Sequence, residues 1–469
     1  MSKRKTKIVC TIGPASWSPE VMRGMIEAGM DVARVNGAFA DTDELDMVKK
    51  LVRDVSNDVA LMVDVKGPEV RLNKFAREIP VFPGENIIIG NSENDLIYPA
   101  NYPDLYESVS EGQKIIVGDG EVEMVVKRVE NGQMYCQVIY GETLAPGRAL
   151  SLPGCEYSSE VLTEKDEENL LHAIDTGWDL VSASFIRNAE SAKEIKKAIG
   201  EADIKLIAKI EDAEGIKNID EILEEVDGVM IARGGLGLEL GLEKIPIVQR
   251  DLLSKLNVAG LPVITATQML ESMTDNPRPT RAETTDVANA ILQGTDAVML
   301  SGESAIGKYP VESVKMMSEI AMEVERTIDP KVLSGSIKAP LTTEALSKAA
   351  AEVCIGMGEN LNAVIIVSKT GTTARLLARH AIKQPIFVFT STETKRRFLK
   401  LTKGVENAFM FKGLDSNGDN YSRDKAIKII LSKAFKKGVV KEGQKVLFLG
   451  KTPVDKEEFF PNLFEIVKL

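Results

Sequence analysis

Side chains that most often carry acid–base and redox chemistry are scarce in this sequence of 469 residues. Its histidines and cysteines are His172, His380, Cys10, Cys136, Cys155 and Cys354. Neither histidine adjoins a glycine-rich turn or a carboxylate pair, which argues against histidine catalysis and histidine metal sites. The cysteines are scattered and form no CxxC pair, so we expect buried, reduced thiols. Lysine and carboxylate side chains must therefore carry the chemistry.

Positive charge and long apolar segments are also in short supply. The formal net charge is −12, which argues against a general affinity for nucleic acid or for an anionic membrane. Any anionic ligand must then be held by a local cluster of cations. No apolar run reaches the length of a membrane span, and the first five residues lead directly into a predicted strand without a signal peptide. We therefore expect a cytoplasmic protein that binds neither nucleic acid nor membrane.

Short apolar runs that alternate with amphipathic segments predict a parallel β/α architecture. Eight of these runs are almost continuously apolar, which is typical of strands buried on both faces. They lie at residues 7–13, 32–36, 60–67, 180–186, 205–211, 228–235, 262–268 and 297–304. Eight repeats over roughly 230 residues fit a closed (β/α)8 TIM barrel once an insertion is removed.

Two further regions differ in composition from the barrel repeats. Residues 70–155 carry Gly, Pro and Asn turns between short alternating strands, which predicts an inserted all-β lid domain. Residues 330–344 form a linker with Pro and Gly. Residues 345–469 are predicted to be a C-terminal α/β domain whose final strand lies at 445–450. The barrel then comprises residues 1–69 and 156–329.

Charged residues at the predicted strand ends are the candidates for chemistry, because the active site of such a barrel lies at the C-terminal ends of its strands. Lys209 lies within an apolar run and needs a nearby anion to keep its charge when buried. Strand alternation places Glu211 on the same face, so the pair is either a structural salt bridge or part of a ligand site. The turn Arg233–Gly237 opens a helix and is suited to binding an anion, but tight packing also explains such glycines.

A hydroxyl-rich loop in the C-terminal domain, SKTGTT at residues 368–373, joins a predicted strand to a predicted helix. Backbone N–H groups at the start of a helix can bind phosphate. The same hydroxyls also occur as ordinary helix caps. The loop is therefore either a phosphate site or a capped helix start.

Motifs along nearly the whole chain resemble those of the pyruvate kinase family. They follow the family's order and read KIVCTIGPAS, ARVN, VDVKGPEVR, LSLPG, LTEKDEENL, ASFIR, AKIED, ATQMLESM, NPRPTRAETTDVANA and MLSGES. The resemblance implies the barrel, lid and C-terminal domain expected above, usually assembled as a homotetramer. It also implies transfer of phosphate from phosphoenolpyruvate to ADP, giving pyruvate and ATP, with Mg²⁺ or Mn²⁺ and with K⁺.

The resemblance assigns roles to individual residues. Lys209 would stabilise charge on the transferred phosphoryl group, Arg34 would bind phosphate, and Thr267 would take part in protonating the enolate. The other implied residues are the substrate contacts Gly234, Gly235 and Ser184, the nucleotide contacts Arg71 and Arg148, the divalent-metal ligand Glu211, the monovalent-cation ligands Asn36, Asp64 and Val65, and the effector candidates Ser368, Lys369, Thr370, Thr372 and Thr373.

Several departures from the family pattern fall at ligand positions. Gly235 replaces the aspartate of Arg-Gly-Asp-Leu-Gly and has no side-chain donor atom. Ala38 removes a hydroxyl ligand of the monovalent cation, and Gly118 replaces an aspartate in the lid. The ending PNLFEIVKL also departs from the family's threonine- and asparagine-rich finish. Because Mg²⁺ is commonly held by one or two carboxylates, these changes predict weakened binding of the divalent metal.

Two other functions stay open, because function resides in the site rather than in the fold. The first is a catalytically impaired relative that binds a carboxylate or phosphate ligand and acts as a regulator. The second is an enzyme that applies enol or lyase chemistry to a related carboxylic acid.

Overall fold

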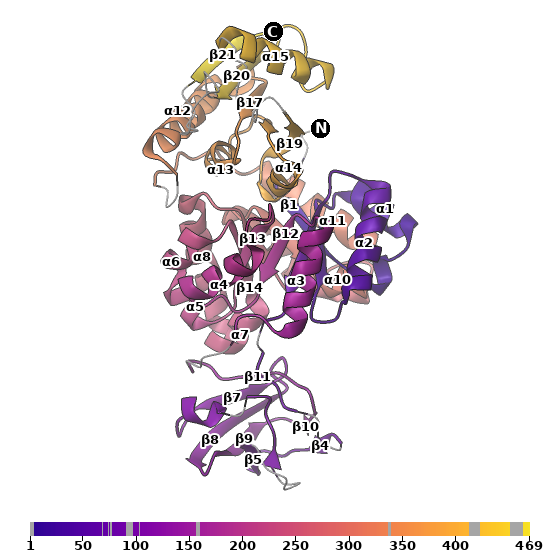
Figure 1. Ribbon diagram of the computed structural model, residues 1–469, viewed down its shortest axis with the longest axis vertical. Helices are drawn as coiled ribbons and strands as arrows, with labels where there is room; N and C mark the ends of the chain where they lie inside the picture. Colours follow the sequence, from indigo (N-terminus) through magenta and orange to yellow (C-terminus); the bar gives the residue numbers. More distant parts are fainter. Residues whose placement is uncertain are drawn as a thin grey trace.

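Three bodies follow one another along the long axis of this computed structural model (Figure 1). The structure describes residues 4–67, 69–73, 75, 77–90, 97–102, 104–155, 160–335, 339–411, 423–450 and 463–469. A closed barrel lies in the middle, with an all-β domain at one end and an α/β domain at the other. Within the described residues, no helix is both long enough and apolar enough to cross a bilayer.

The barrel contains the eight strands that the apolar runs predicted. They are β1 (Lys7–Ile12), β2 (Val32–Asn36), β3 (Ala60–Val65), β12 (Leu180–Ala183), β13 (Lys205–Ile210), β14 (Gly228–Ala232), β15 (Val263–Ala266) and β16 (Ala297–Leu300). All neighbours pair in parallel, and β1 closes the ring by pairing with both β2 and β16. Most of these strands end before their apolar run does, because the last residues of the run turn into the loops at the barrel rim.

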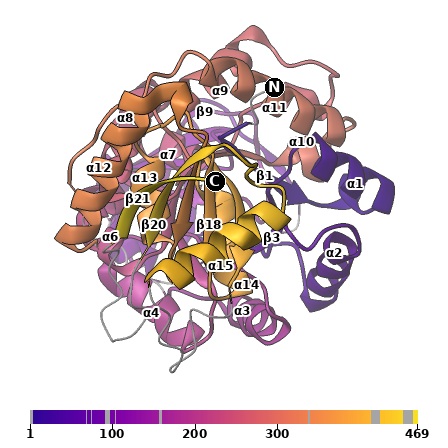
Figure 2. The same ribbon diagram turned by 90° about the horizontal axis from the view of Figure 1, so that it is seen from above.

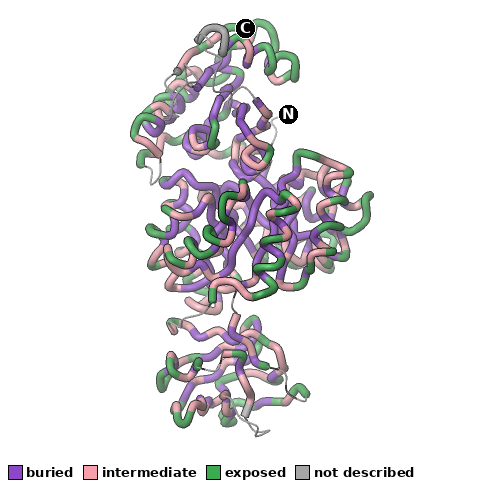
Figure 3. The backbone as a smooth tube through the Cα atoms, in the orientation of Figure 1, coloured by how far each residue is buried: buried purple, intermediate pink, exposed green. Residues whose placement is uncertain are grey.

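Helices surround the barrel and cover its outer face (Figure 2). They are α1 (Pro19–Ala28), α2 (Thr42–Val55), α3 (Glu164–Thr176), α4 (Ala189–Ile199), α5 (Ala213–Lys217), α6 (Ile219–Glu225), α7 (Arg233–Leu240), α8 (Ile245–Ala259), α9 (Arg281–Leu292), α10 (Gly302–Ala305) and α11 (Pro310–Glu325). Side chains such as Ser18, Thr163 and Thr280 cap helix starts by accepting backbone N–H bonds. The apolar faces of these helices bury the main core against the strands (Figure 3).

The inserted domain leaves the barrel after β3 and returns before α3, at the C-terminal ends of the barrel strands. Its strands are β4 (Ile79–Pro80), β5 (Asn86–Gly90), β6 (Ile97–Tyr98), β7 (Lys114–Val117), β8 (Val122–Glu130), β9 (Gln133–Tyr140), β10 (Thr143–Leu144) and β11 (Leu150–Ser151). Six of them form one sheet in the order β11-β7-β8-β9-β5-β6, and β4 pairs with β10. A separate apolar core stabilises this domain.

The C-terminal domain is a five-stranded sheet with helices on both faces. Its elements are α12 (Leu341–Met357), β17 (Ala363–Val367), α13 (Thr372–Ala378), β18 (Ile386–Thr390), α14 (Glu393–Phe398), β19 (Val405–Met410), α15 (Arg423–Lys436), β20 (Lys445–Gly450) and β21 (Leu463–Lys468). Residues 445–450 were wrongly predicted as the final strand, because β21 follows and pairs antiparallel with β20. Of the divergent ending, Pro461 and Asn462 lie outside the described residues.

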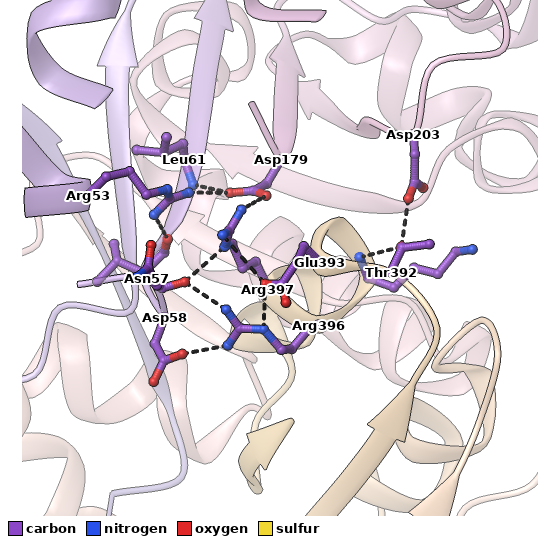
Figure 4. Close-up of polar contacts among 12 residues, drawn as sticks. Arg53, Asn57, Asp58, Leu61, Asp179, Asp203, Thr392, Glu393, Arg396 and Arg397 are labelled. Carbon is purple, nitrogen blue, oxygen red and sulfur yellow. Dashed lines mark hydrogen bonds and ion pairs between the residues drawn. The ribbon is translucent and has the colours of Figure 1, made fainter. Parts of the chain in front are cut away.

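The C-terminal domain closes the barrel at the N-terminal ends of its strands. Phe398 of α14 and the nearby Leu401 pack into the apolar cluster that fills the barrel interior. Arg397 pairs with the buried Asp179 at 3.1 Å, and Asp179 also accepts from Arg53 and from the backbone N–H of Leu61 (Figure 4). This junction joins α14 to α2 and to the starts of two barrel strands.

Candidate active site

A cavity of about 310 Å³ lies at the C-terminal ends of the barrel strands, between the barrel rim and the inserted domain. It brings together residues from β2, β3, β13, the loop after β12 and the start of α7, which are far apart in the sequence. The residues assigned from the sequence that line it are Arg34, Asn36, Asp64, Arg71, Ser184, Lys209, Glu211, Gly234 and Gly235.

Lys209 lies at the centre of this arrangement. Its Nζ is 3.1 Å from Asp64 Oδ1 and 3.1 Å from Glu211 Oε1, and it donates to Ser184 Oγ at 2.6 Å. Alternation along β13 accounts for the contact with Glu211. Asp64 comes instead from β3, which is not adjacent to β13 in the barrel but faces the same rim.

Arg34 supplies the second cation of the cluster. Its Nε is 2.8 Å from Asp64 Oδ2, and its Nη1 donates to Thr11 Oγ1 at 2.9 Å. Asp64 therefore accepts from a guanidinium on one oxygen and from an ammonium on the other. Two cations and two carboxylates, with Glu211 as the second, balance the formal charge of the cluster.

Burial and ion pairing set the protonation states of these groups. Burial opposes the charge of Lys209, but Asp64 and Glu211 together raise its pKa above the usual value. Burial also opposes ionisation of Asp64, yet Arg34 and Lys209 lower its pKa. Burial raises the pKa of Glu211, and Lys209 offsets this only in part. The ion pairs of the cluster thus favour the charged form of Lys209, whereas burial disfavours the charged form of Glu211.

The glycine turn forms the first residues of α7, which begins at Arg233. The Gly234 N–H donates to Thr267 Oγ1 at 2.9 Å, so Thr267 contacts the turn rather than lining the cavity. Thr267 has a positive φ of 70°, an uncommon and strained conformation for a β-branched residue. A Cβ added at Gly235 would lie 3.0 Å from both the Cβ and the carbonyl oxygen of Glu211. Glycine at this position therefore lets α7 pack closely against the end of β13.

The two arginines assigned to nucleotide binding lie in different surroundings. Arg71 lines the cavity, where it donates to Glu69 Oε2 and to the Gly147 carbonyl, both at 2.7 Å. Arg148 pairs with Glu121 at 2.9 Å and is half exposed, outside the cavity lining. Of these two arginines, Arg71 lies at the cavity and Arg148 does not.

The oxygen atoms assigned to bind a monovalent cation already accept hydrogen bonds from other groups of the protein. Asn36 Oδ1 accepts from the Ala38 N–H at 3.2 Å, and the Val65 carbonyl accepts from Ser184 Oγ at 3.0 Å. Asp64 holds the two cations described above. Ala38 lines the same cavity and contributes a methyl group there.

The effector candidates lie in the C-terminal domain, at the opposite end of the barrel from this cavity (Figure 1). Ser368 Oγ accepts from the Gly371 N–H at 3.0 Å. Thr372 Oγ1 is 2.9 Å from Thr370 Oγ1 and accepts from Arg375 Nη2 at 3.1 Å. These bonds order the loop before α13, whose N-cap residue is Gly371 and whose start has no side-chain cap. The loop is separate from the catalytic candidates.

Two further carboxylates of the cavity lining have partners within the protein. Asp212 pairs with Arg187 at 2.6 Å, and Glu239 accepts from the Gly154 N–H at 3.3 Å. Among the residues that the structure describes, no group of three or more acidic, histidine or cysteine side chains could hold a metal ion. Glu211 is therefore the one assigned carboxylate available to a divalent metal, and it is shared with Lys209.

Some cavity contacts received no role from the sequence. Thr11 orients Arg34, and Arg187 and Asp212 form an ion pair in the cavity lining. Arg187 and Asp212 end the motifs ASFIR and AKIED just beyond a strand, so their position was the available signal. The contact of Thr11 depends on the pairing of β1 with β2 and had no local signal.

Comparison with known proteins agrees with this fold. The sequence pattern "Pyruvate kinase, barrel domain" matches residues 3–314, and "Pyruvate kinase, alpha/beta domain" matches residues 344–467. A pyruvate kinase of Sporosarcina psychrophila is 41% identical over 418 residues, which cover 86% of this chain and 71% of the relative. One from Geobacillus stearothermophilus is 39% identical over 468 residues, covering 96% and 78%.

A solved structure gives the same result in three dimensions. The crystal structure of a pyruvate kinase from Cryptosporidium parvum superimposes with a TM-score of 0.88 at 32% sequence identity, covering 99% of this chain and 96% of the other. Both domain patterns, the overall sequence identity and the closed barrel with its two attached domains lead to one conclusion. The chain belongs to the pyruvate kinase family.

Proposed function

We propose that this protein transfers the phosphoryl group of phosphoenolpyruvate to ADP, giving pyruvate and ATP. The observation that carries the proposal is the pair of cations, Lys209 and Arg34, held at the C-terminal rim of a barrel of the pyruvate kinase family. Cations fixed at this position stabilise the charge that spreads over a phosphoryl group during transfer.

Each part of the reaction has candidate residues. Lys209 and Arg34 bind and orient the phosphoryl group. The backbone N–H groups of Gly234 and Gly235 at the start of α7 hold the substrate carboxylate, and the Gly234 N–H does so in exchange for its bond to Thr267 Oγ1. When the phosphoryl group leaves for the terminal phosphate of ADP, the bond to the enol oxygen breaks and an enolate remains. Protonation of its terminal carbon gives pyruvate, and Thr267 is the residue proposed to take part in that proton transfer.

ADP and ATP are proposed to bind beside the inserted domain. Arg71 lies in the cavity and is the nearer nucleotide candidate. Arg148 would have to leave Glu121 to reach a phosphate. Ser184 supports Lys209 through its hydroxyl and so acts on the substrate through that lysine.

The pyruvate kinase family generally uses Mg²⁺ and K⁺. The residues present do not fit a divalent site built by the protein alone, because Gly235 has no donor and Glu211 is paired with Lys209. Asn36, Asp64 and Val65 have oxygen atoms that could bind K⁺, but each of these atoms already accepts a hydrogen bond. The side chain of Ala38 has no oxygen atom. We propose weak binding of both ions, with Glu211 as the divalent ligand.

Other proposals concern regulation and assembly. Ser368, Lys369, Thr370, Thr372 and Thr373 are the candidate effector contacts, since their loop presents hydroxyls at the start of α13. We propose a homotetramer in the cytoplasm. The large exposed side chains Leu242 (77% exposed) and Ile247 (51% exposed), near the start of α8, are suited to a contact between subunits.

The second candidate function is that of a regulatory protein of this family that binds ligand without turnover. The observation that favours it is the charge balance of the cluster, because Asp64 and Glu211 already neutralise the two cations that a substrate phosphate would need.

Pyruvate formation from phosphoenolpyruvate and ADP, measured over a Mn²⁺ titration, separates these functions. Wild type should turn over and should need more Mn²⁺ than Gly235→Asp, which restores a carboxylate. Gly235→Ala is the matched control, because it adds the same Cβ without a ligand and should gain nothing. If wild type binds phosphoenolpyruvate but forms no pyruvate at any Mn²⁺ concentration, the kinase proposal is wrong and the regulatory one stands.

A further inference from the structure

A second cavity, of about 350 Å³, lies at the opposite end of the barrel, where the barrel base meets the C-terminal domain. Its volume is in the range of small-molecule sites. The barrel contributes the C-terminal ends of α8, α9 and α11 and the residues before β1. The C-terminal domain contributes the end of α13, the residues leading into β18, and Lys403 and Gly404. A molecule bound here would touch both domains.

Cations outnumber acids in the lining of this cavity. Six lining side chains are positive and two are negative, namely Lys5, Arg250, Lys331, Arg379, Lys383 and Lys403 against Glu325 and Asp329. Two of these cations have carboxylate partners outside the lining, since Arg379 pairs with Glu344 at 2.6 Å and Arg250 pairs with Asp251 at 3.1 Å. Four lysines then remain against the two carboxylates, of which Glu325 accepts the backbone N–H groups of Lys5 at 2.8 Å and Thr6 at 2.6 Å. The lining therefore carries an excess of positive charge.

Two of the ammonium groups have neutral partners. Lys5 donates to the Ile382 carbonyl, and Lys403 donates to Asn257 Oδ1 at 2.7 Å and to the Gly294 carbonyl. In the described part of the chain, no carboxylate lies within ion-pair distance of either ammonium. Carbonyl oxygens satisfy the hydrogen bonds but leave the net charge in place.

The environment of these lysines disfavours their charge. Burial lowers the pKa of Lys5 to about 8, with the nearby Lys383 adding to the shift and Glu325 opposing it. Burial also lowers the pKa of Lys403, with Asp296 opposing the shift. A bound anion would stabilise both protonated amines.

Arg379 adds a further unsatisfied donor. Its two terminal nitrogens are used, since Nη2 pairs with Glu344 at 2.6 Å and Nη1 donates to the carbonyls of Val258 and Gly335. Its Nε–H is buried and, among the described residues, has no hydrogen-bond partner. Such a donor is costly to leave unpaired.

Apolar side chains form much of the remaining wall. Ile291 and Ile328 come from the barrel side, Leu333 from the linker and Ile382 from the C-terminal domain. A bare inorganic anion would leave these surfaces in contact with water. A ligand with an apolar body would cover them while its charged group meets the lysines.

We propose that this cavity is a second ligand site, which takes a small organic anion with an apolar body between the barrel base and the C-terminal domain. The site is separate from the catalytic cavity and from the loop at residues 368–373. Because the ligand contacts both domains, its binding favours the docked arrangement seen here and raises thermal stability as its concentration rises. The proposal does not depend on the catalytic activity.

Calorimetric titration of the full chain with 1-naphthyl phosphate tests the proposal. We expect saturable binding, weakened about tenfold in Lys403→Met and in Lys5→Met, because each loses a charge-assisted contact. Lys255→Met is the matched control, since Lys255 lies on α8, pairs with Asp220 and does not line the cavity. Its affinity should match wild type. The neutral 1-naphthol and inorganic phosphate alone should each bind at least about tenfold more weakly.

A second measurement is needed because Lys5 and Lys403 each join the two domains, and the loss of either could loosen them. A crystal structure of the unmodified protein with 1-naphthyl phosphate should place the ring beside Ile291 and Ile382, with the phosphate near Lys403. No saturable binding, binding that neither cavity variant weakens, or a ligand located elsewhere in the crystal would each overturn the proposal.

Discussion

At the scale of single residues, the catalytic candidates depend on one another for their charge. Lys209 is held by Asp64 and Glu211, and Asp64 is also held by Arg34. Removing one member leaves its partner buried and unpaired, so effects on activity and on stability should appear together. A residue that only bound substrate at the surface would change activity alone.

Lys209→Met should abolish most turnover and also destabilise the protein. We expect kcat to fall by about 10²–10³-fold, as for loss of a major electrostatic contact to the transition state. The free energy of unfolding should fall by about 3 kcal/mol, because Glu211 loses its ion-pair partner in a buried site. Steady-state kinetics and urea unfolding measure the two effects, and Lys255→Met on the surface of α8 should change neither. Normal turnover in Lys209→Met would exclude the proposed role.

The buried side chain of His380 should make the stability of the folded protein depend on pH. It is fully buried, its Nδ1 accepts from the Leu333 N–H at 3.0 Å, and burial lowers its pKa to about 4. An unfolded histidine titrates near pH ~6.5, so between these values the unfolded chain binds more protons than the folded one. The contribution of His380 to stability is therefore present above pH ~6.5 and is lost as the pH falls towards 4.

The measurement compares wild type with His380→Gln, which keeps an acceptor for Leu333. From about pH 7 to about pH 5, wild type should lose about 2 kcal/mol of unfolding free energy relative to this variant. Parallel pH profiles for wild type and His380→Gln would contradict the prediction.

At the scale of elements, α14 links the C-terminal domain to the barrel through two adjacent arginines in different environments. Arg397 pairs with Asp179, whose side chain is 1% exposed, whereas Arg396 pairs with Asp58, whose side chain is 58% exposed. Burial of the partner carboxylate decides what each pair contributes.

Arg397→Met should therefore destabilise the protein more than Arg396→Met. We expect a loss of about 2 kcal/mol for Arg397→Met, because Asp179 keeps Arg53 but loses one of its buried cations. The Asp58 ion pair lost in Arg396→Met should account for about 1 kcal/mol or less, since Asp58 returns to water. Urea unfolding of the two variants gives the comparison. Equal losses, or a larger one for Arg396→Met, would show that the hydrogen bonds to Asn57 and Glu393 dominate instead.

At the scale of the whole molecule, the two attached domains cover opposite ends of the barrel. The inserted domain faces the catalytic candidates, and the C-terminal domain packs Phe398 and Leu401 into the barrel base. The sides of the barrel stay available for contacts between subunits.

Sedimentation equilibrium should give a mass four times that of the chain if the proposed tetramer forms. Ile247→Glu should reduce that mass, because it places a charge in an apolar contact. Leu171→Glu on α3, at a site that is 54% exposed, is the matched control and should leave the mass unchanged. A wild-type protein with the mass of one chain would rule out the tetramer.

The sequence by itself determined the strands of the barrel and the shared strand face of Lys209 and Glu211. Both depend on local periodicity, since buried parallel strands are continuously apolar and alternate residues share a face. The family motifs also identified Arg34, Asp64 and the glycine turn as candidates for one site. The same motifs predict that Gly235 leaves the divalent metal without one side-chain ligand.

The tertiary structure decided which of these residues meet and which do not. Closure of the barrel places Asp64 between Arg34 and Lys209, while Arg148 pairs with Glu121 outside the cavity. The close approach of Gly235 to Glu211 and the cavity at the barrel base likewise come from segments far apart in the sequence. Local patterns carry no information on such distances, because loop paths and domain docking set them.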